Sequence, residues 1–186
     1  MNTDTQTDTT NGINSKAQNQ INEALKHNPA MAQITFQASN EWKGGTSSRS
    51  RISRFSMAGG SHPHKQAFEV DTDLPMPFLG SDRAPTPAEY ALHALAACMN
   101  STMVYNCSAR GITVRSSAAE IEGDLDARGF VRLDDSIRAG YQTIRIHFKV
   151  DADAPREVIE DLLKGSPMFD VFSRSVPIQL ELETSL

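Results

Sequence analysis

Residues 86–111 of the chain read TPAEYALHALAACMNSTMVYNCSARG, and this stretch predicts one long helix. Thr86 suits the N-cap, a proline follows at the first helical position, and Glu89 completes a capping box by accepting the Thr86 amide. Gly111 ends the helix, because glycine adopts a left-handed backbone without penalty. The helix would be about 36 Å long. Its first half is rich in alanine and nearly free of charge, which is typical of a buried helix, and Cys98 stands at its centre.

The composition is that of a chain able to build a core. It has 186 residues, of which 39% are hydrophobic and 22% charged, so we expect one domain, or one domain with a tail. The net charge of −5 and the lack of a Lys/Arg-dense stretch argue against a nucleic-acid partner. No apolar run approaches the roughly 20 residues that span a bilayer, and the polar start does not resemble a secretory signal. Two cysteines make no disulfide framework, so we expect a cytoplasmic location.

The start of the chain differs from the rest. Residues 1–28 are dominated by Asn, Thr, Gln, Asp and Ser, and they predict a polar extension that is partly disordered. We expect disorder over Met1–Asn11 and a short amphipathic helix over Ile13–Leu25. The folded domain is predicted to occupy residues 29–186.

The remaining pattern predicts an α+β fold. Before the central helix, glycine turns separate three strands of an antiparallel meander: Met31–Trp42, Arg49–Met57 and Gln66–Val70. A proline-rich loop, Asp71–Thr86, leads into the helix, which is expected over Pro87–Arg110. After it come two strands, a helix and a last strand: Thr113–Asp126, Tyr141–Val150, Pro155–Leu163 and Val176–Glu183, with a short helical piece opening at Ser166-Pro167. The order is therefore β-β-β-α-β-β-α-β, with the long central helix against sheet.

A helix this long and apolar is hard to cover with one set of strands. An intertwined homodimer that buries two central helices together would solve the problem, but the pattern alone leaves a monomer equally open.

The two cysteines are expected on opposite faces of the helix. Cys98 and Cys107 are nine residues apart, which places them about 13.5 Å apart along the axis. A disulfide needs Cα atoms within about 7 Å, so the two cannot bridge while the helix is intact. Small residues at Ala91 and Ala94 leave space over the Cys98 sulfur for a ligand or substrate. Either cysteine could instead be a small hydrophobe of the core.

A reactive Cys98 would need a neighbouring cation. The thiolate is the nucleophilic form, and a mid-helix position gains little from the helix dipole. The candidates are the arginines of the second strand and of the loop before the helix, each of which could also be a surface charge: Arg49, Arg51, Arg54 and Arg83.

Neither a metal nor a cofactor is expected. His62 and His64 form a single H-x-H without a third ligand nearby in sequence, which is more typical of a polar turn. The Gly-Gly pairs lie in hairpin turns and show no phosphate-loop pattern.

The segment from Pro85 to Cys98 resembles the signature of the OsmC/Ohr family of osmotically induced and organic-hydroperoxide-resistance proteins. The likeness extends over about Ala30 to Leu182. Further matching segments follow in the family's order: Trp42-Lys43-Gly44-Gly45, Leu79-Gly80-Ser81-Asp82, Gly111-Ile112, Glu122-Gly123-Asp124-Leu125-Asp126, Ser166-Pro167-Met168-Phe169-Asp170 and Val176-Pro177.

This resemblance implies an intertwined α+β homodimer with its active sites at the subunit interface. In active members a helix-borne cysteine attacks a hydroperoxide and becomes a sulfenic acid, and a second cysteine captures it as a disulfide. A dithiol such as a lipoyl group then reduces the disulfide, while arginine and glutamate hold the first cysteine as thiolate. Cys98 matches the attacking position.

The chain also departs from the family pattern. The second cysteine precedes a proline, where this chain has Ser166. The glutamate follows the helix-opening proline directly, where this chain has Ala88, and Glu89 comes one step later. No arginine matches the family's position, and Arg83 is the nearest.

Two functions follow as hypotheses. In the first, the protein reduces a small organic hydroperoxide through Cys98, with Glu89 and Arg83 as candidate helpers and an external thiol or dithiol as resolving partner. In the second, a non-catalytic dimer binds a small apolar ligand at the subunit interface. A structural, stress-related dimer is a third interpretation.

Overall fold

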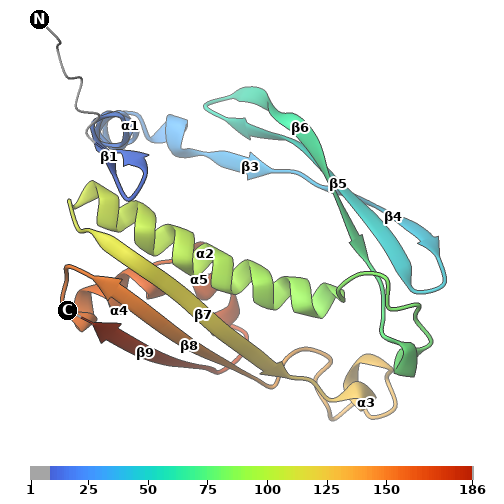
Figure 1. Ribbon diagram of the computed structural model, residues 1–186. Helices are drawn as coiled ribbons and strands as arrows, with labels where there is room; N and C mark the ends of the chain where they lie inside the picture. Colours follow the sequence, from blue (N-terminus) through green and yellow to red (C-terminus); the bar gives the residue numbers. More distant parts are fainter. Residues whose placement is uncertain (1–8, 186) are drawn as a thin grey trace, which may run out of the picture. The chain divides into compact units, whose positions relative to one another are not determined.

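The computed structural model describes residues 9–185, which form two compact units (Figure 1). The first unit comprises the described residues up to Gln18 together with those from Ala91 onward, and the second is Asn19–Tyr90. Among the described residues, no helix combines the length and the apolar character that crossing a membrane requires.

The predicted central helix is present as α2, Pro87–Ala109, and is confirmed to within one residue. Its capping box also forms: the Thr86 amide donates to Glu89 Oε2 at 2.7 Å, and the Glu89 amide donates to Thr86 Oγ1 at 3.1 Å. At the other end Gly111 has a φ of +71°, the left-handed conformation that glycine adopts most easily.

The sheet of the first unit has three strands in the order β7-β8-β9: Val114–Asp124, Thr143–Ala152 and Ile178–Ser185. β7 and β8 are antiparallel, whereas β8 and β9 are parallel. A parallel pair needs a crossover connection, which α4 (Arg156–Lys164) and α5 (Pro167–Ser173) supply. The predicted order of the second half is therefore confirmed. A short helix, α3 (Ala127–Phe130), was not predicted; it follows β7 and is capped by Asp126.

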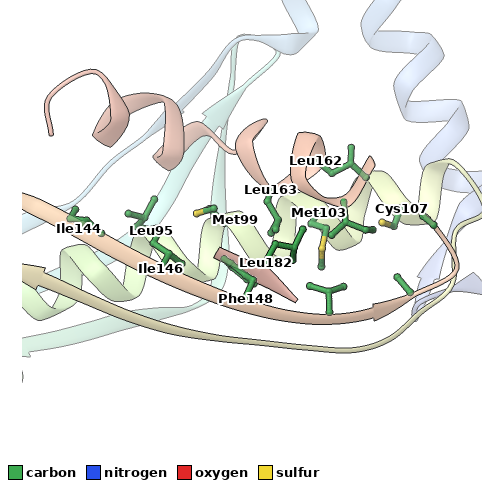
Figure 2. Packing of buried hydrophobic residues seen from close by; sticks show 14 of the residues in the cluster. Leu95, Met99, Met103, Cys107, Ile144, Ile146, Phe148, Leu162, Leu163 and Leu182 are labelled. Atoms are coloured by element: carbon green, nitrogen blue, oxygen red, sulfur yellow. The ribbon is translucent and has the colours of Figure 1, made fainter. Parts of the chain in front are cut away.

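The core of this unit lies between β8 and α2. Alternate residues of β8 are almost fully buried, among them Ile144, Ile146 and Phe148, while the intervening residues face outward. Figure 2 shows these side chains meeting those of α2, α4 and β9. The buried side chains of α2 recur every four residues, as the helical repeat requires for one face: Leu95, Met99, Met103 and Cys107.

The opposite face of α2 is open in the single chain. The residues that remain exposed there are small or polar, apart from one tyrosine: His93, Ala94, Ala97, Ser101 and Tyr105. The predicted buried helix is thus buried along one face only, and the other face carries mostly short or polar side chains.

A small N-terminal hairpin packs on the end of α2. Strands β1 (Thr9–Thr10) and β2 (Ile13–Asn14) join through Asn11, whose side chain donates to Ser108 Oγ and to the Ile112 carbonyl and accepts from the Val114 amide at 2.8 Å. The predicted disorder is therefore wrong for Thr9–Asn11; the rest of that segment, residues 1–8, lies outside the described residues. The composition of the segment did not reveal this order, because the order depends on a single asparagine side chain that hydrogen-bonds to backbone groups far away in the sequence.

The predicted amphipathic helix forms as α1, Ser15–His27. It differs from the prediction in that its most buried side chain is polar. Gln18 is 2% exposed and donates from Nε2 to the Tyr105 carbonyl at 2.6 Å.

The second unit contains an antiparallel sheet built around β5, Ser47–Met57. β6 (Gly60–Thr72) pairs along one edge, while β3 (Ile34–Phe36) and β4 (Ser39–Gly44) follow each other along the other. The predicted single strand Met31–Trp42 is thus wrong in detail, since a 3₁₀ turn at Pro29–Ala32 delays it and the register breaks after Phe36. A second 3₁₀ turn, Met76–Phe78, lies in the loop before α2.

The third predicted strand was too short. The segment containing His62 and His64, expected to be a turn, lies inside β6, and the β5–β6 hairpin turns earlier at Ala58-Gly59. Pro63 is tolerated there because β6 is an edge strand with a register shift nearby.

The two faces of this sheet differ in character. One face carries ion pairs, including Arg49 to Asp71 at 2.6 Å and Lys43 to Glu41 at 2.6 Å. The other, which we call the apolar face, consists of Ile34, Phe36, Trp42, Phe55 and Phe68. Phe36 and Trp42 are 78% and 71% exposed, so no other described part of the chain covers them.

Phe148→Ala should lower the free energy of unfolding by about 3–5 kcal/mol, because it empties a site at the centre of the core. Denaturant unfolding followed by circular dichroism measures the change. Lys149→Ala, on the neighbouring outward-facing position, is the matched control and should change stability by less than about 0.5 kcal/mol. Equal losses in the two variants would contradict the placement of the core.

Candidate functional site

Cys98 lies on α2 in a half-exposed position. Ala94 and Ala97, which precede it, are exposed, and the Ser101 hydroxyl donates to the Cys98 carbonyl at 3.2 Å. Cys98 is therefore flanked by short side chains, as the sequence predicted, and part of the residue is exposed in the single chain.

Cys107 has a different environment. It is fully buried with Met103 in the core, and burial raises the pKa of its thiol, an effect that Arg110 only partly opposes (Figure 2). A buried thiol held in its protonated form is a small hydrophobe rather than a nucleophile. The core interpretation is confirmed for Cys107, whereas Cys98 is only partly buried and its role stays a prediction.

Ser166, at the position where the resemblance implies a second cysteine, is an N-cap. Its side chain is fully buried, and its Oγ accepts the Phe169 amide at 3.2 Å at the start of α5. The residue satisfies a helix end that would otherwise leave an unpaired amide.

Glu89 is occupied at the start of α2. Its Oε2 accepts from both the amide and the hydroxyl of Thr86, at 2.7 and 2.9 Å. These hydrogen bonds, the backbone one foremost, lower the pKa of the Glu89 carboxyl. The carboxylate thus stabilises the helix terminus, where a negative charge is also favoured by the helix dipole.

Arg83 lines a polar cavity of about 400 Å³ within the second unit. The turn between β4 and β5, the end of β6 and the loop before α2 form its walls. The cavity is lined by Lys43, Gly44, Gly45, Thr46, Ser47, Ser48, Arg49, Asp71, Thr72, Asp73, Leu79, Ser81, Arg83 and Ala84.

Asp73 holds this region together. It is 2% exposed, and its Oδ1 accepts from the Thr46 hydroxyl at 2.6 Å while its Oδ2 accepts from the Ser81 amide at 3.0 Å. The Thr46 hydroxyl first, and then the backbone amides of Leu74, Ser81 and Arg83, lower the pKa of Asp73 to about 2. The buried carboxylate therefore joins the β4–β5 turn to the loop that carries Arg83.

Sequence reasoning missed Asp73. The only available signal was an acidic residue at the end of a strand, just before a loop rich in proline and glycine, and nothing in that pattern marks the aspartate as buried.

The other candidate arginines lie on β5. Arg49 pairs with Asp71 and Glu69, and the Asp71 hydrogen bond raises the pKa of Arg49. Arg51 lies 3.5 Å from Glu69. Arg49 and Arg83 line the same cavity, whereas Cys98 belongs to the first unit.

The histidines of β6 are held by aromatic rings. His62 stacks on Phe55 with ring centroids 5.3 Å apart, and His64 contacts Phe55 and Phe68. Among residues 9–185, no group of three or more His, Cys, Asp or Glu side chains is arranged to hold a metal ion.

Fold and site together define a class: an α+β protein with an accessible cysteine on a long central helix. A protein-family model described as OsmC-like protein matches residues 80–181. The match covers more than half of the chain, which therefore belongs to the OsmC-like family. No curated protein matches the sequence.

Solved structures support the same fold. An OsmC-like protein from Mycoplasma pneumoniae aligns with a TM-score of 0.62 at 14% identity, covering 82% of this chain and 98% of that one. An organic hydroperoxide resistance protein OsmC from Legionella pneumophila aligns with a TM-score of 0.54 at 13% identity, covering 80% and 97%. Identities this low establish the fold, and the predicted OsmC-like α+β architecture is confirmed.

Asp73→Asn should make the protein less stable at neutral pH and its stability less sensitive to acid. A carboxyl whose pKa is depressed from 3.8 to about 2 contributes stability above its ordinary value and loses it as the pH falls through about 2. The free energy of unfolding of the wild type should fall in this range, and that of the variant should fall less steeply. Asp135→Asn, at an exposed loop position, is the control. Identical slopes for wild type and Asp73→Asn would refute this role.

Proposed function

We propose that this protein reduces organic hydroperoxides through Cys98, with an external thiol as the resolving partner. The observation that carries the proposal is the contrast between the two thiols. Cys98 is accessible among short side chains on the outer face of α2, whereas Cys107 is fully buried in the core. Family membership adds support, because an organic hydroperoxide resistance protein shares the fold.

The reaction proceeds in balanced steps. The Cys98 thiolate attacks the terminal oxygen of the hydroperoxide, the O–O bond breaks, and the departing alkoxide takes a proton to leave as the alcohol. Cys98 is thereby oxidised to a sulfenic acid. An external dithiol forms a mixed disulfide with it and releases water, and the second thiol of that reductant then frees the Cys98 thiolate and becomes a disulfide itself.

The resolving thiol comes from outside because the chain offers none. Ser166 has no redox chemistry and caps α5, and Cys107 lies on the buried face of the same helix. A helix that keeps its two cysteines on opposite faces cannot join them.

We assign the supporting roles as follows. Arg83 is the cation proposed to favour the Cys98 thiolate; no ion pair of its guanidinium occurs within residues 9–185, and the Asp73 network fixes its backbone. Glu89 fixes the start of α2 through its capping box. A location in the cytoplasm, where thiol reductants are abundant, completes the proposal.

The active form is proposed to be a homodimer. The apolar face leaves Phe36 and Trp42 exposed, and an antiparallel sheet normally buries one of its two faces. No described residue covers that face, and the OsmC-like family membership supports an intertwined homodimer as its cover. A second copy, contributing the same apolar face, provides the missing partner.

Binding without catalysis is the second candidate. One observation favours it. Where the family pattern has its second cysteine and its glutamate, this chain has Ser166 and Ala88, which cannot perform those roles. In that case a small apolar molecule would occupy the space beside Cys98 at the subunit interface.

The test is turnover of cumene hydroperoxide with dihydrolipoamide as reductant. Wild type and Cys107→Ser should consume peroxide at similar rates, and Cys98→Ser should fall to the uncatalysed background because the attacking atom is gone. Circular dichroism checks that each variant is folded. Activity that survives in Cys98→Ser would overturn the assignment, and a wild type without turnover that still binds the alcohol product would favour the binding role.

A further inference from the structure

Five aromatic rings form a continuous strip on the apolar face of the second unit. Phe55 lies at its centre, with ring centroids 6.3 Å from Phe36, 5.3 Å from His62 and 5.5 Å from His64. His64 in turn meets Phe68 edge-on at 5.4 Å. Two imidazoles are thus built into a surface that is otherwise apolar.

The charged groups around these imidazoles are cationic or engaged elsewhere. On β6, Lys65 follows His64 directly; on β5, Arg54 pairs with Pro63, next to the Phe55–His62 pair, and so lies on the other face of the sheet. β3 contributes Ile34, Thr35 and Phe36, none of which titrates.

The nearest acidic residue along β6 is Glu69, and it is held on the charged face of the sheet. Arg49 and Arg51 bind its carboxylate at 3.3 and 3.5 Å. No carboxylate lies within ion-pair distance of His62 or His64 among the described residues. A positive charge on either imidazole would therefore have no counter-ion among residues 9–185.

We propose that protonation of His64, assisted by His62, releases the second copy from the apolar face, so that the dimer weakens in mild acid. This inference rests on the homodimer of the proposed function and assigns its regulation.

The direction of the pH dependence follows from the cost of covering a charged imidazole at an interface. Histidine changes charge between about pH 5 and 8, and its neutral ring packs against phenylalanine as a flat, largely apolar group. Covering a protonated ring without a counter-ion removes its water at high cost. The dimer therefore prefers the neutral rings, is stable at higher pH and loses stability as the pH falls.

The two imidazoles should not contribute equally. His62 Nε2 lies 3.3 Å from the Met57 carbonyl, an acceptor that a protonated ring can still use. His64 makes only ring contacts with Phe55 and Phe68 among the described residues. Most of the pH response is therefore expected from His64.

Sedimentation velocity of the full chain across a concentration series, at about pH 8 and about pH 5.5, provides the test. The dissociation constant of the wild-type dimer should rise at least about tenfold on acidification, because each pH unit over which association must release a proton changes that constant by a factor of ten. His64→Phe, which keeps a ring but cannot take a proton, should lose most of this rise, and His64→Leu is a second uncharged variant in case the larger ring does not fit. His27→Gln, on the exposed surface of α1, is the matched control and should behave as the wild type does.

Three outcomes overturn the proposal in distinguishable ways. A chain that is monomeric at about pH 8 would refute the homodimer of the proposed function together with its regulation. A dimer with the same dissociation constant at both pH values would refute the regulation alone. A rise that persists undiminished in His64→Phe would refute the assignment to this strip, and circular dichroism at both pH values separates dissociation from unfolding.

Discussion

The packing of α2 on β8 is the constraint on which the rest of the protein depends. Leu95, Met99 and Met103 form one face of the helix, and this face meets the inward-facing side chains of β8, so the rotation of α2 about its axis is fixed. That rotation decides which of the two thiols is buried. Cys107 continues the buried series and becomes part of the core, whereas Cys98 falls outside it and remains accessible. The chemistry proposed for the protein is therefore a consequence of core packing, since a half-turn of the same helix would bury Cys98 and expose Cys107 instead.

Several polar side chains that could have served a reaction serve the backbone instead. Glu89 and Ser166 cap α2 and α5, Asp73 joins a hairpin to a loop, and Asn11 supplies partners to the end of α2 and the start of β7. Each of these contacts satisfies amides or carbonyls that would otherwise be unpaired, which costs free energy when they are buried. Of the two cysteines, Cys98 is the less buried and is the nucleophile that we propose. The proposed reaction therefore takes its reducing equivalents from a separate molecule.

Sequence reasoning recovered those parts of the fold that depend on local pattern. The long helix was predicted to within one residue because Thr86, Glu89 and Gly111 mark its ends, and β8 was predicted because its alternation is strict. The errors occurred where a long-range contact decides the local conformation. Asn11 is ordered by partners about a hundred residues away, and the segment around His62 extends β6 because Phe55 provides a neighbouring ring. At the candidate site, the different exposures of Cys98 and Cys107 follow from helix periodicity. The burial of Asp73 could not be predicted, because a loop has no repeating pattern in the sequence that marks which of its residues point inward.

The most direct test of the central claim is the intact mass of the wild-type protein after one equivalent of cumene hydroperoxide, measured with and without a sulfenic-acid trap and without reductant. We expect a product heavier by one oxygen atom that the trap captures at Cys98, with Cys107 still a free thiol after digestion. A product lighter by two hydrogen atoms, with Cys98 and Cys107 joined, would contradict the account, because a disulfide between them requires α2 to unwind and to lose its packing against β8.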